Sequence, residues 1–380
     1  MTASVLSAPG GAVAPPPPPP PPEAQLTPRQ LMWLRFKRHR MAMAGAIVVL
    51  AIYAVALLAE FLSPMDPNWG RARFSLHPPQ PLQLFDASGA FKLHVQAWKM
   101  QRDPETLQPR YVRDGERIIE VGLFVPTEEP WHLLGLIPMQ RKLIGTRDPT
   151  QPLYLAGADR LGRDMLSRTL HGARISMSIG LLGVAASLLL GVLIGGLSGY
   201  LGGRTDWLLQ RLTEFVIALP TIPIWMALAA ALPKDWPPLL TYFMITVIVS
   251  LIGWTDLARV VRGRFLSLRN EDFVTAARVD GCSEMRIVLR HMLPSMTSHI
   301  IATVSLAIPM MILAETALSF LGLGLQPPSI SWGVLLKEVQ NVRSIALAPW
   351  LFLPGAAVVV AVLALNFLGD GLRDAADPYA

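Results

Sequence analysis

The sequence predicts an all-α integral membrane protein with six transmembrane helices and a small, partly β insertion between the first two. Three observations support this fold class. Hydrophobic residues make up 52% of the 380 residues and charged residues only 16%, against roughly 25% charged in an ordinary globular domain. Six apolar stretches are long enough to cross a bilayer. The basic residues of the short connections gather on one side of the predicted membrane, which is typical of multi-pass proteins.

The first predicted span follows a proline-rich tail and a basic patch. Residues 1–28 include eight consecutive prolines, a run that forms a stiff, solvated rod, so we expect a disordered cytoplasmic tail. Residues 41–62 carry one charged side chain, Glu60, and at 1.5 Å per residue extend about 33 Å, enough for a hydrocarbon core of roughly 30 Å. Segment 29–62 is therefore interpreted as a basic entry and the first transmembrane helix.

Five further apolar stretches complete the set of spans. Each carries few charged residues away from its ends, so insertion into the bilayer is favoured over exposure to water. We expect helices over residues 175–200, 212–232, 239–260, 300–323 and 350–368, followed by a cytoplasmic C-terminus at 372–380. Pro220 and Pro223 interrupt the stretch 212–232 and can kink its helix.

The connections between the spans differ in charge. Seven arginines lie between Arg259 and Arg290, whereas the loops predicted to face outward carry only Lys234, Lys337 and Arg343. By the positive-inside rule, this difference places both termini in the cytoplasm. The calculated pI of 9.7 thus reflects topology, and nucleic acid is not an expected partner.

Residues 63–158 form a predicted extracytoplasmic insertion. The segment has no apolar run long enough to span a membrane. Residues 117–125 are rich in β-branched side chains, and residues 91–95 alternate in polarity, so the two predict a hairpin. Residues 159–174 then predict an amphipathic helix lying on the outer membrane surface. Its lipid-facing side chains would be Leu161, Met165, Leu166 and Leu170.

Several classes of protein are excluded by what the sequence lacks. A single cysteine, Cys282, permits no intramolecular disulfide and no cysteine-only zinc site. The phosphate-binding loop of ATPases is absent, as are the zinc motif His-Glu-x-x-His and the nucleophile motif Gly-x-Ser-x-Gly. We therefore expect no catalytic residue, no metal and no cofactor in this chain, and we do not expect it to be an enzyme.

Small residues, prolines and one buried charge mark the predicted spans. Gly191, Gly195 and Gly199 recur at every fourth position, which favours close packing of two helices within the chain over a role in binding substrate. Glu315 lies inside the fifth span, where ionisable residues are functional candidates, and Pro309 can kink the same helix. Both are candidates for the pathway or its gate. A hydrogen-bonded structural role is the competing interpretation of Glu315.

One predicted cytoplasmic loop, residues 270–294, has an unusual pattern. Asn270 can cap a short helix, with Glu271 and Asp272 near its positive end. Gly281 ends or bends that helix, and a second helical stretch follows. Two short helices with a face of small residues suit docking into a groove of a partner. A basic amphipathic loop lying on anionic lipid is the alternative.

The same loop resembles the EAA loop of ABC importer permeases, the coupling helix that contacts the ATPase subunit. The matching residues are Ala276, Ala277, Gly281, Leu293 and Pro294. Thr275 stands where that family has Glu, and His291 where it has Ile, so no salt bridge is implied at position 275. The resemblance implies that the ATPase-coupling residues are Glu271, Asp272, Ala276, Ala277, Arg278, Gly281, Leu293 and Pro294.

Three other segments narrow the resemblance. Residues 157–174, 314–333 and 365–374 are similar to signatures of the C-type permease subunit of oligopeptide, dipeptide and nickel importers. They lie before the second span, at the end of the fifth and at the C-terminus. The resemblance implies the type I ABC importer permease fold, with its transmembrane domain at residues 172–371.

The resemblance also implies a function and partners. A second permease subunit would complete a heterodimer in the bacterial inner membrane, with two cytoplasmic ABC ATPase subunits and an extracytoplasmic substrate-binding protein. Similar permeases import oligopeptides, dipeptides, nickel complexes, glutathione or sugars, and peptide import is our expectation. The alternative is a stand-alone secondary transporter that uses Glu315 to bind a proton, whose transport would follow the proton gradient. A sensory membrane protein would leave the coupling-type loop unexplained.

Overall fold

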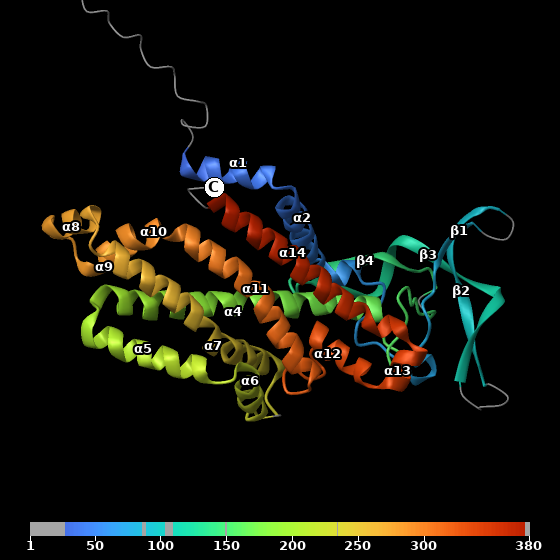
Figure 1. The fold of residues 1–380 in the computed structure, drawn as a ribbon. Helices are drawn as coiled ribbons and strands as arrows, with labels where there is room; N and C mark the ends of the chain where they lie inside the picture. The colour runs from blue at the N-terminus through green and yellow to red at the C-terminus, as the bar shows by residue number, and fades with distance from the viewer. Residues whose placement is uncertain (1–26, 86–88, 103–108, 149, 234, 377–380) are drawn as a thin grey trace, which may run out of the picture.

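The computed structural model describes residues 27–85, 89–102, 109–148, 150–233 and 235–376. Long helices pack side by side, with a β-sheet beyond one end of the bundle (Figure 1). We call this the sheet end. We call the opposite end, which carries α8 (Asp272–Val279), α9 (Glu284–Ile287) and α10 (Leu293–Ser295), the α8 end. The predicted tail, residues 1–28, lies almost entirely outside the described residues.

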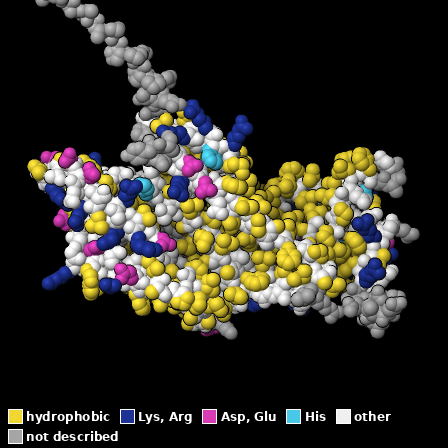
Figure 2. All heavy atoms as spheres, viewed as in Figure 1, with side chains coloured by type: hydrophobic (Ala, Val, Ile, Leu, Met, Phe, Trp, Pro, Cys, Tyr) yellow, Lys and Arg dark blue, Asp and Glu magenta, His cyan; other side chains and the backbone are white. Residues whose placement is uncertain are grey.

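Five helical stretches are each long and apolar enough to cross a membrane, as the sequence predicts. They are α2 (Arg40–Leu57), α4 (Met165–Leu201), α7 (Pro238–Leu268), α11 (Thr297–Phe320) and Pro349–Ala376, which joins a 3-10 turn to α14 (Leu353–Ala376). Hydrophobic side chains cover much of the middle of the molecule, whereas charged side chains gather at the α8 end (Figure 2). This distribution is expected of a protein whose middle faces lipid.

The span predicted over residues 212–232 is present as a pair of helices with a sharp bend between them. The structure has two helices there, α5 (Gly203–Ala218) and α6 (Thr221–Ala230), bent by 85° at the break. Pro220 is the cause, because it lacks a backbone donor and disfavours helical geometry in the residue before it. Leu219 accordingly adopts an extended conformation with ψ 134°. The two helices meet the length and composition expected of a span only when taken together.

The predicted surface helix over residues 159–174 is wrong. Residues 159–164 form a turn closed by a β-bridge between Ala158 and Asp164. The Asp164 carboxylate then caps α4 by accepting a hydrogen bond from the Ser167 amide at 2.7 Å. Met165 is 1% exposed instead of facing lipid, because the start of α4 packs against residues 336–351. Residues 165–174 are thus helical, as predicted, but they form the first part of the long helix α4 and not a separate surface helix.

The glycine pattern in α4 packs this helix against α7, which confirms the interpretation as a contact within the chain. A Cβ atom at Gly191 would lie 2.9 Å from the Leu257 side chain, and one at Gly199 would lie 2.6 Å from Phe265 Cβ. At Gly195, a Cβ atom would overlap the carbonyl oxygen of Ala258. The small residues therefore let the two backbones approach more closely than any side chain permits.

The insertion carries an antiparallel sheet in the order β1 (Leu82–Phe85), β2 (Phe91–Arg102), β3 (Pro109–Leu133) and β4 (Ile137–Thr146). Both predicted strands and their hairpin are confirmed, since Val95 pairs with Ile119. The first half of β3 pairs with β2 and the second half with β4. The side chains of Val95, Ile119 and Leu153 pack together as a small core.

Shorter elements complete the described chain. Near the N-terminus, α1 begins after Thr27, which forms a capping box with Gln30, and it lies beside the end of α14 (Figure 1). Helix α1 comprises Pro28–Arg38. The other short elements are α3 (Ala59–Leu62), η2 (Ala72–Phe74), α8 (Asp272–Val279), α9 (Glu284–Ile287), the π-helical turn η3 (Val288–Met292), α10 (Leu293–Ser295), α12 (Trp332–Leu336), η4 (Lys337–Gln340), α13 (Val342–Leu347) and η5 (Pro349–Phe352).

Candidate functional site

The α8 helix is fixed to the ends of the long helices by its inner face. Val274 is fully buried and Ala277 is 6% exposed, and both belong to an apolar cluster with Val261 and Phe265 of α7. The Arg278 guanidinium lies 5.6 Å from the centre of the Tyr200 ring, at the end of α4. The inner face of α8 therefore packs against the ends of α4 and α7.

Gly281 ends α8 in a glycine-specific turn. The Cys282 amide donates to the Ala277 carbonyl at 3.0 Å, and the Gly281 amide donates to the Arg278 carbonyl at 3.0 Å. This pair of bonds is the Schellman motif, in which the residue after the cap is left-handed. Gly281 has φ +73°, and a Cβ atom there would meet no heavy atom within 4 Å. Backbone conformation, not space, thus requires glycine.

The outer face of this region exposes apolar side chains. Phe273 is 41% exposed, Val279 82%, Met285 64% and Leu289 54%. Isolated exposed leucines need no explanation, but large apolar side chains on two neighbouring short helices indicate a contact surface. Val279, the most exposed of the four, is not among the coupling residues predicted from the sequence.

The structure separates the predicted coupling residues into two groups. Ala277 points inward, and Leu293 is half-buried beside the same apolar cluster. The exposed members are Glu271, Asp272, Ala276, Arg278, Gly281 and Pro294. The predicted Asn270 cap is wrong, because α8 begins after Glu271 and has no side-chain cap.

An ion pair that the sequence interpretation misses joins α5 to α7 near the α8 end. Arg262 donates to both carboxylate oxygens of Asp206, at 2.5 Å and 2.7 Å. The Ser198 hydroxyl, at the end of α4, donates to the same carboxylate. Such two-point contacts fix orientation as well as distance. Asp206 and Arg262 are 56 residues apart in the sequence, so no local sequence pattern indicates that they form an ion pair.

Glu315 lies at the centre of a buried hydrogen-bond network. Its carboxyl group is fully buried and accepts hydrogen bonds from the hydroxyls of Ser331 at 2.7 Å, Ser319 at 2.8 Å and Ser176 at 3.3 Å. The Ser176 oxygen in turn accepts a bond from the Trp332 amide at 3.1 Å. The network therefore ties α4, α11 and α12 together. This arrangement supports the structural interpretation, and a gating role of Glu315 stays a prediction.

Pro309, the other gating candidate, is buried within α11. The helix continues without a break from Thr297 to Phe320, although proline removes one backbone donor. Neither Pro309 nor Glu315 lines the two cavities described next.

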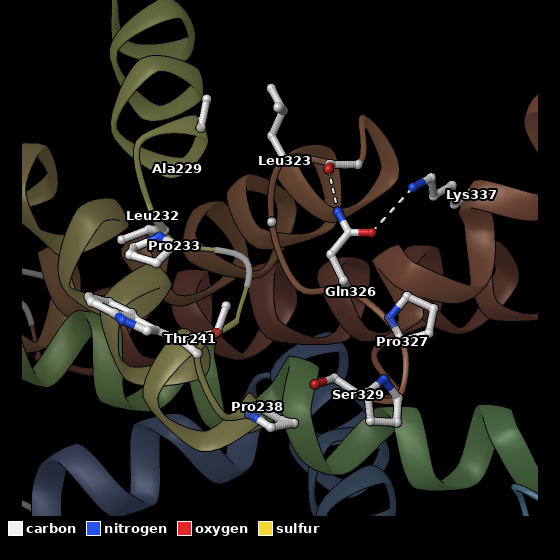
Figure 3. A pocket seen from close by; sticks show the side chains of 15 residues that line it. Ala229, Leu232, Pro233, Pro238, Thr241, Leu323, Gln326, Pro327, Ser329 and Lys337 are labelled. Atoms are coloured by element: carbon white, nitrogen blue, oxygen red, sulfur yellow. Dashed lines mark hydrogen bonds between the residues drawn. The ribbon is translucent and has the colours of Figure 1, made fainter.

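Two cavities are lined by residues of α6 and α7. The inner cavity, of about 400 Å³, is bounded by α4, α6, α7 and α11 and includes Ser187, Trp225, Asp256 and Met310. The outer pocket, of about 500 Å³, lies at the turn between α6 and α7 and includes Trp236, Thr241 and the loop over residues 322–329 (Figure 3). On α7 the outer pocket is lined at Thr241 and the inner cavity at residues 252–257, a separation of about 17–24 Å along the axis.

An apolar cluster lies between the two cavities. Trp225 and Met311 belong to this cluster and also line the inner cavity, whereas Ala229 and Leu323 belong to it and line the outer pocket. The cluster is thus an apolar barrier shared by α4, α6, α7 and α11. The indole nitrogen of Trp225 is buried without a hydrogen-bond partner in the described part of the chain.

An ion cluster holds the start of α4 at the sheet end. Asp159 accepts from Arg163 Nε at 2.6 Å and lies 3.6 Å from Arg168 Nε, and Arg163 lies 3.5 Å from Glu338 of η4. Burial raises the pKa of the neighbouring Asp164 carboxyl to about 6. Within the described residues, no group of three His, Cys, Asp or Glu side chains could hold a metal ion.

A bundle of apolar helices with two cavities and a pair of short helices packed at one end is the architecture expected of a membrane transport subunit. Comparison with known proteins identifies its kind. Residues 188–379 match the family described as "Binding-protein-dependent transport system inner membrane component", and residues 27–79 match the "N-terminal TM domain of oligopeptide transport permease C". The chain therefore belongs to the binding-protein-dependent transport permeases, as an ABC importer permease of the C type.

Individual relatives agree with this membership. The chain is 40% identical over 256 residues to the oligopeptide transport system permease protein OppC of Haemophilus influenzae, covering 67% of this chain and 76% of the relative. It is 31% identical over 353 residues to the di/tripeptide transport system permease protein DppC of Pseudomonas aeruginosa, covering 93% and 92%. A solved structure of the inward-facing MetNI methionine ABC transporter matches with TM-score 0.44 and 14% identity, over 56% of this chain and 98% of that chain.

Proposed function

We propose that this chain forms half of the translocation pathway of an ATP-driven importer of peptides and couples that pathway to a cytoplasmic ATPase. The relatives named as oligopeptide and di/tripeptide permeases support the substrate class. A second permease subunit in a heterodimer, two ATPase subunits and an extracytoplasmic binding protein complete the proposed assembly. Residues 172–371 are the proposed transport domain.

The α8 end is the proposed cytoplasmic end. Arg262, Arg278 and Arg286 lie there with other arginines of the segment between α7 and α11, in agreement with the positive-inside rule. The last turn of α14 and the start of α1 lie at the same end (Figure 1), so both termini of the described chain are proposed to be cytoplasmic. The β-sheet then faces the substrate-binding protein.

One observation carries the proposed coupling mechanism: α8, α9 and α10 lie in the chain directly between α7, which lines both cavities, and α11, which lines the inner one. Helix α7 ends at Leu268 and α8 begins at Asp272, while α10 ends at Ser295 and α11 begins at Thr297. An ATPase that closes on nucleotide and moves the exposed face of α8 would pull on both helices. The apolar barrier between the cavities could then open on one side at a time, which is the bistable behaviour that such coupling needs.

The function is tested with the native complex, purified through a tag on this chain and reconstituted in vesicles. We expect uptake of radiolabelled peptides that requires ATP on the ATPase side and the binding protein on the other. Dissipating the proton gradient with an ionophore should leave the initial rate unchanged. Uptake that collapses with the gradient and continues without ATP would support the secondary transporter instead.

Replacing Gly281 by glutamate should uncouple transport from ATP hydrolysis. A left-handed conformation costs an ordinary L residue roughly 1–2 kcal/mol, so the turn after α8 shifts and the docking face moves with it. We expect ATP-dependent uptake to fall by about tenfold while the complex still assembles, since 1.4 kcal/mol corresponds to a factor of ten. Gly281→Asn should retain more activity, because asparagine tolerates this conformation better.

The matched control for this variant is Gly263→Glu. Gly263 is exposed near the same end of α7, has ordinary helical geometry, and a Cβ atom there meets nothing within 4 Å. It introduces the same side chain without distorting a turn, so uptake should change less than twofold, within the usual range of surface substitutions of about 0.5 kcal/mol. Normal uptake and ATPase stimulation in assembled Gly281→Glu complexes would remove Gly281 from the coupling surface.

A further inference from the structure

The wall of the outer pocket carries one positively charged side chain and is otherwise uncharged among the described residues. Lys337, at the start of η4, is the one charged side chain among the described residues that line it. Its ammonium contacts the Gln326 side-chain oxygen at 3.3 Å and forms no ion pair with a carboxylate in the described part of the chain. An ammonium group has three donors, so a single neutral acceptor leaves capacity for an anion.

The loop around residue 322 positions this ammonium. The Gln326 side-chain nitrogen donates to the Gly322 carbonyl, and its oxygen accepts from Lys337, as the dashed lines in Figure 3 show. Gly322 has φ +78°, and a Cβ atom at this position would lie 2.9 Å from Lys337 Nζ. Glycine at this turn therefore leaves the space that the ammonium occupies.

The remaining wall is mostly apolar, apart from Thr241 and Ser329. Four prolines and Trp236 line the pocket together with Leu323, and proline side chains lose little conformational freedom when a ligand packs on them. A volume of about 500 Å³ lies within the usual range of ligand pockets, roughly 300–1,000 Å³. The pocket therefore suits an apolar side chain that lies next to a negative charge.

We propose that the outer pocket receives the C-terminal end of an incoming peptide. The terminal carboxylate pairs with Lys337, and the last side chain packs against Trp236. This inference rests on the proposed import of peptides and adds which end of the peptide the permease recognises. The same helix, α6, contributes Ala229 to this pocket and Trp225 to the inner cavity, so a peptide held here lies against the apolar barrier it must pass.

The test compares two peptides of one sequence, one with a free C-terminal carboxylate and one with a C-terminal amide. Initial rates of ATP-dependent uptake are measured in vesicles and normalised to the amount of assembled complex. The binding protein is the same in every complex, so its own preference cancels when the rate ratio of a variant is divided by that of the native complex. We expect Lys337→Gln to lower the ratio by about fivefold, the upper value for an exposed ion pair.

Three further variants make the result specific. Lys337→Arg keeps the charge and should keep most of the preference for the free carboxylate. Arg160→Gln removes an exposed cation at the same end that does not line the pocket, and its ratio should equal that of the native complex. Gln326→Leu removes the acceptor that orients Lys337, and it should lower the ratio in the same direction, by less.

The outcomes separate this inference from the proposed function. An unchanged ratio in Lys337→Gln, or an equal fall in Arg160→Gln, overturns the carboxylate site while peptide import stands. A native complex that takes up neither peptide with ATP overturns the proposed function, and the site assignment with it. If Lys337→Gln does not assemble, the ratio in Gln326→Leu decides, and no change there overturns the proposal.

Discussion

Replacing Gly195 by leucine is expected to reduce the folded protein recovered from membranes by about tenfold or more. Overpacking a well-packed interior typically costs roughly 1–3 kcal/mol where neighbouring side chains can shift, and 1.4 kcal/mol is a factor of ten. At Gly195 the obstacle is the backbone carbonyl of Ala258, which cannot shift without separating α4 from α7. The measurement is the monodisperse fraction of tagged protein in size-exclusion chromatography.

Gly263→Leu is the matched control for this prediction. It makes the same substitution in α7, where a Cβ atom meets no heavy atom within 4 Å. We expect recovery close to that of the native protein, since leucine is also a better helix former than glycine by roughly 0.8–1 kcal/mol. Equal recovery of the two variants would show that α4 and α7 are not in backbone contact.

Replacing Glu315 by alanine should destabilise the protein by about 3 kcal/mol or more. Three serine hydroxyls lose their acceptor, and each buried polar group left without a partner costs roughly 1–3 kcal/mol. The loss should release α12 from α4 and α11, because Ser331 both bonds to Glu315 and caps α12. The measurement is the thermal midpoint of the purified complex, with ATP-dependent uptake as the second readout.

Glu315→Gln and Glu214→Ala complete this experiment. The amide keeps the size of the carboxyl group and one acceptor oxygen, so its loss of stability should be clearly smaller. Glu214 is exposed and pairs only locally with Arg211 at 2.7 Å, a contact worth about 0.5 kcal/mol or less. If Glu315→Ala were as stable as Glu214→Ala but inactive, Glu315 would act in the pathway, as the alternative interpretation holds.

The elements that sequence predicts well are those fixed by local chemistry. Hydropathy predicts the five single spans because each helix satisfies its own backbone in lipid. The hairpin of residues 91–95 and 117–125 follows from alternation and β-branching, and Gly281 follows from its place after a short helix. In each case, the residues that determine the structure lie within a few positions of one another.

The predictions from sequence are wrong or incomplete where the conformation of a segment depends on residues far away in the chain. The turn at residues 159–164 is held by Arg168 and by Glu338, which is far away in the sequence, so the local amphipathic pattern was misleading. The network of Glu315 depends on Ser176 of another helix and on Ser331 beyond the end of α11. Pro220 and Pro223 predict an interruption of the third span, but hydropathy averages over a window and gives no angle for the bend of 85°.

The length of α4 has a mechanical meaning. Its 37 residues run without a break, so the helix extends about 55 Å, well beyond a hydrocarbon core of roughly 30 Å. Tyr200 touches Arg278 of α8 at one end, and Asp164 begins the helix beside the sheet at the other. A stiff rod of this kind behaves as a lever, in which any tilt applied by a motor at one membrane face reappears at the opposite face without a chain of intermediate side-chain movements.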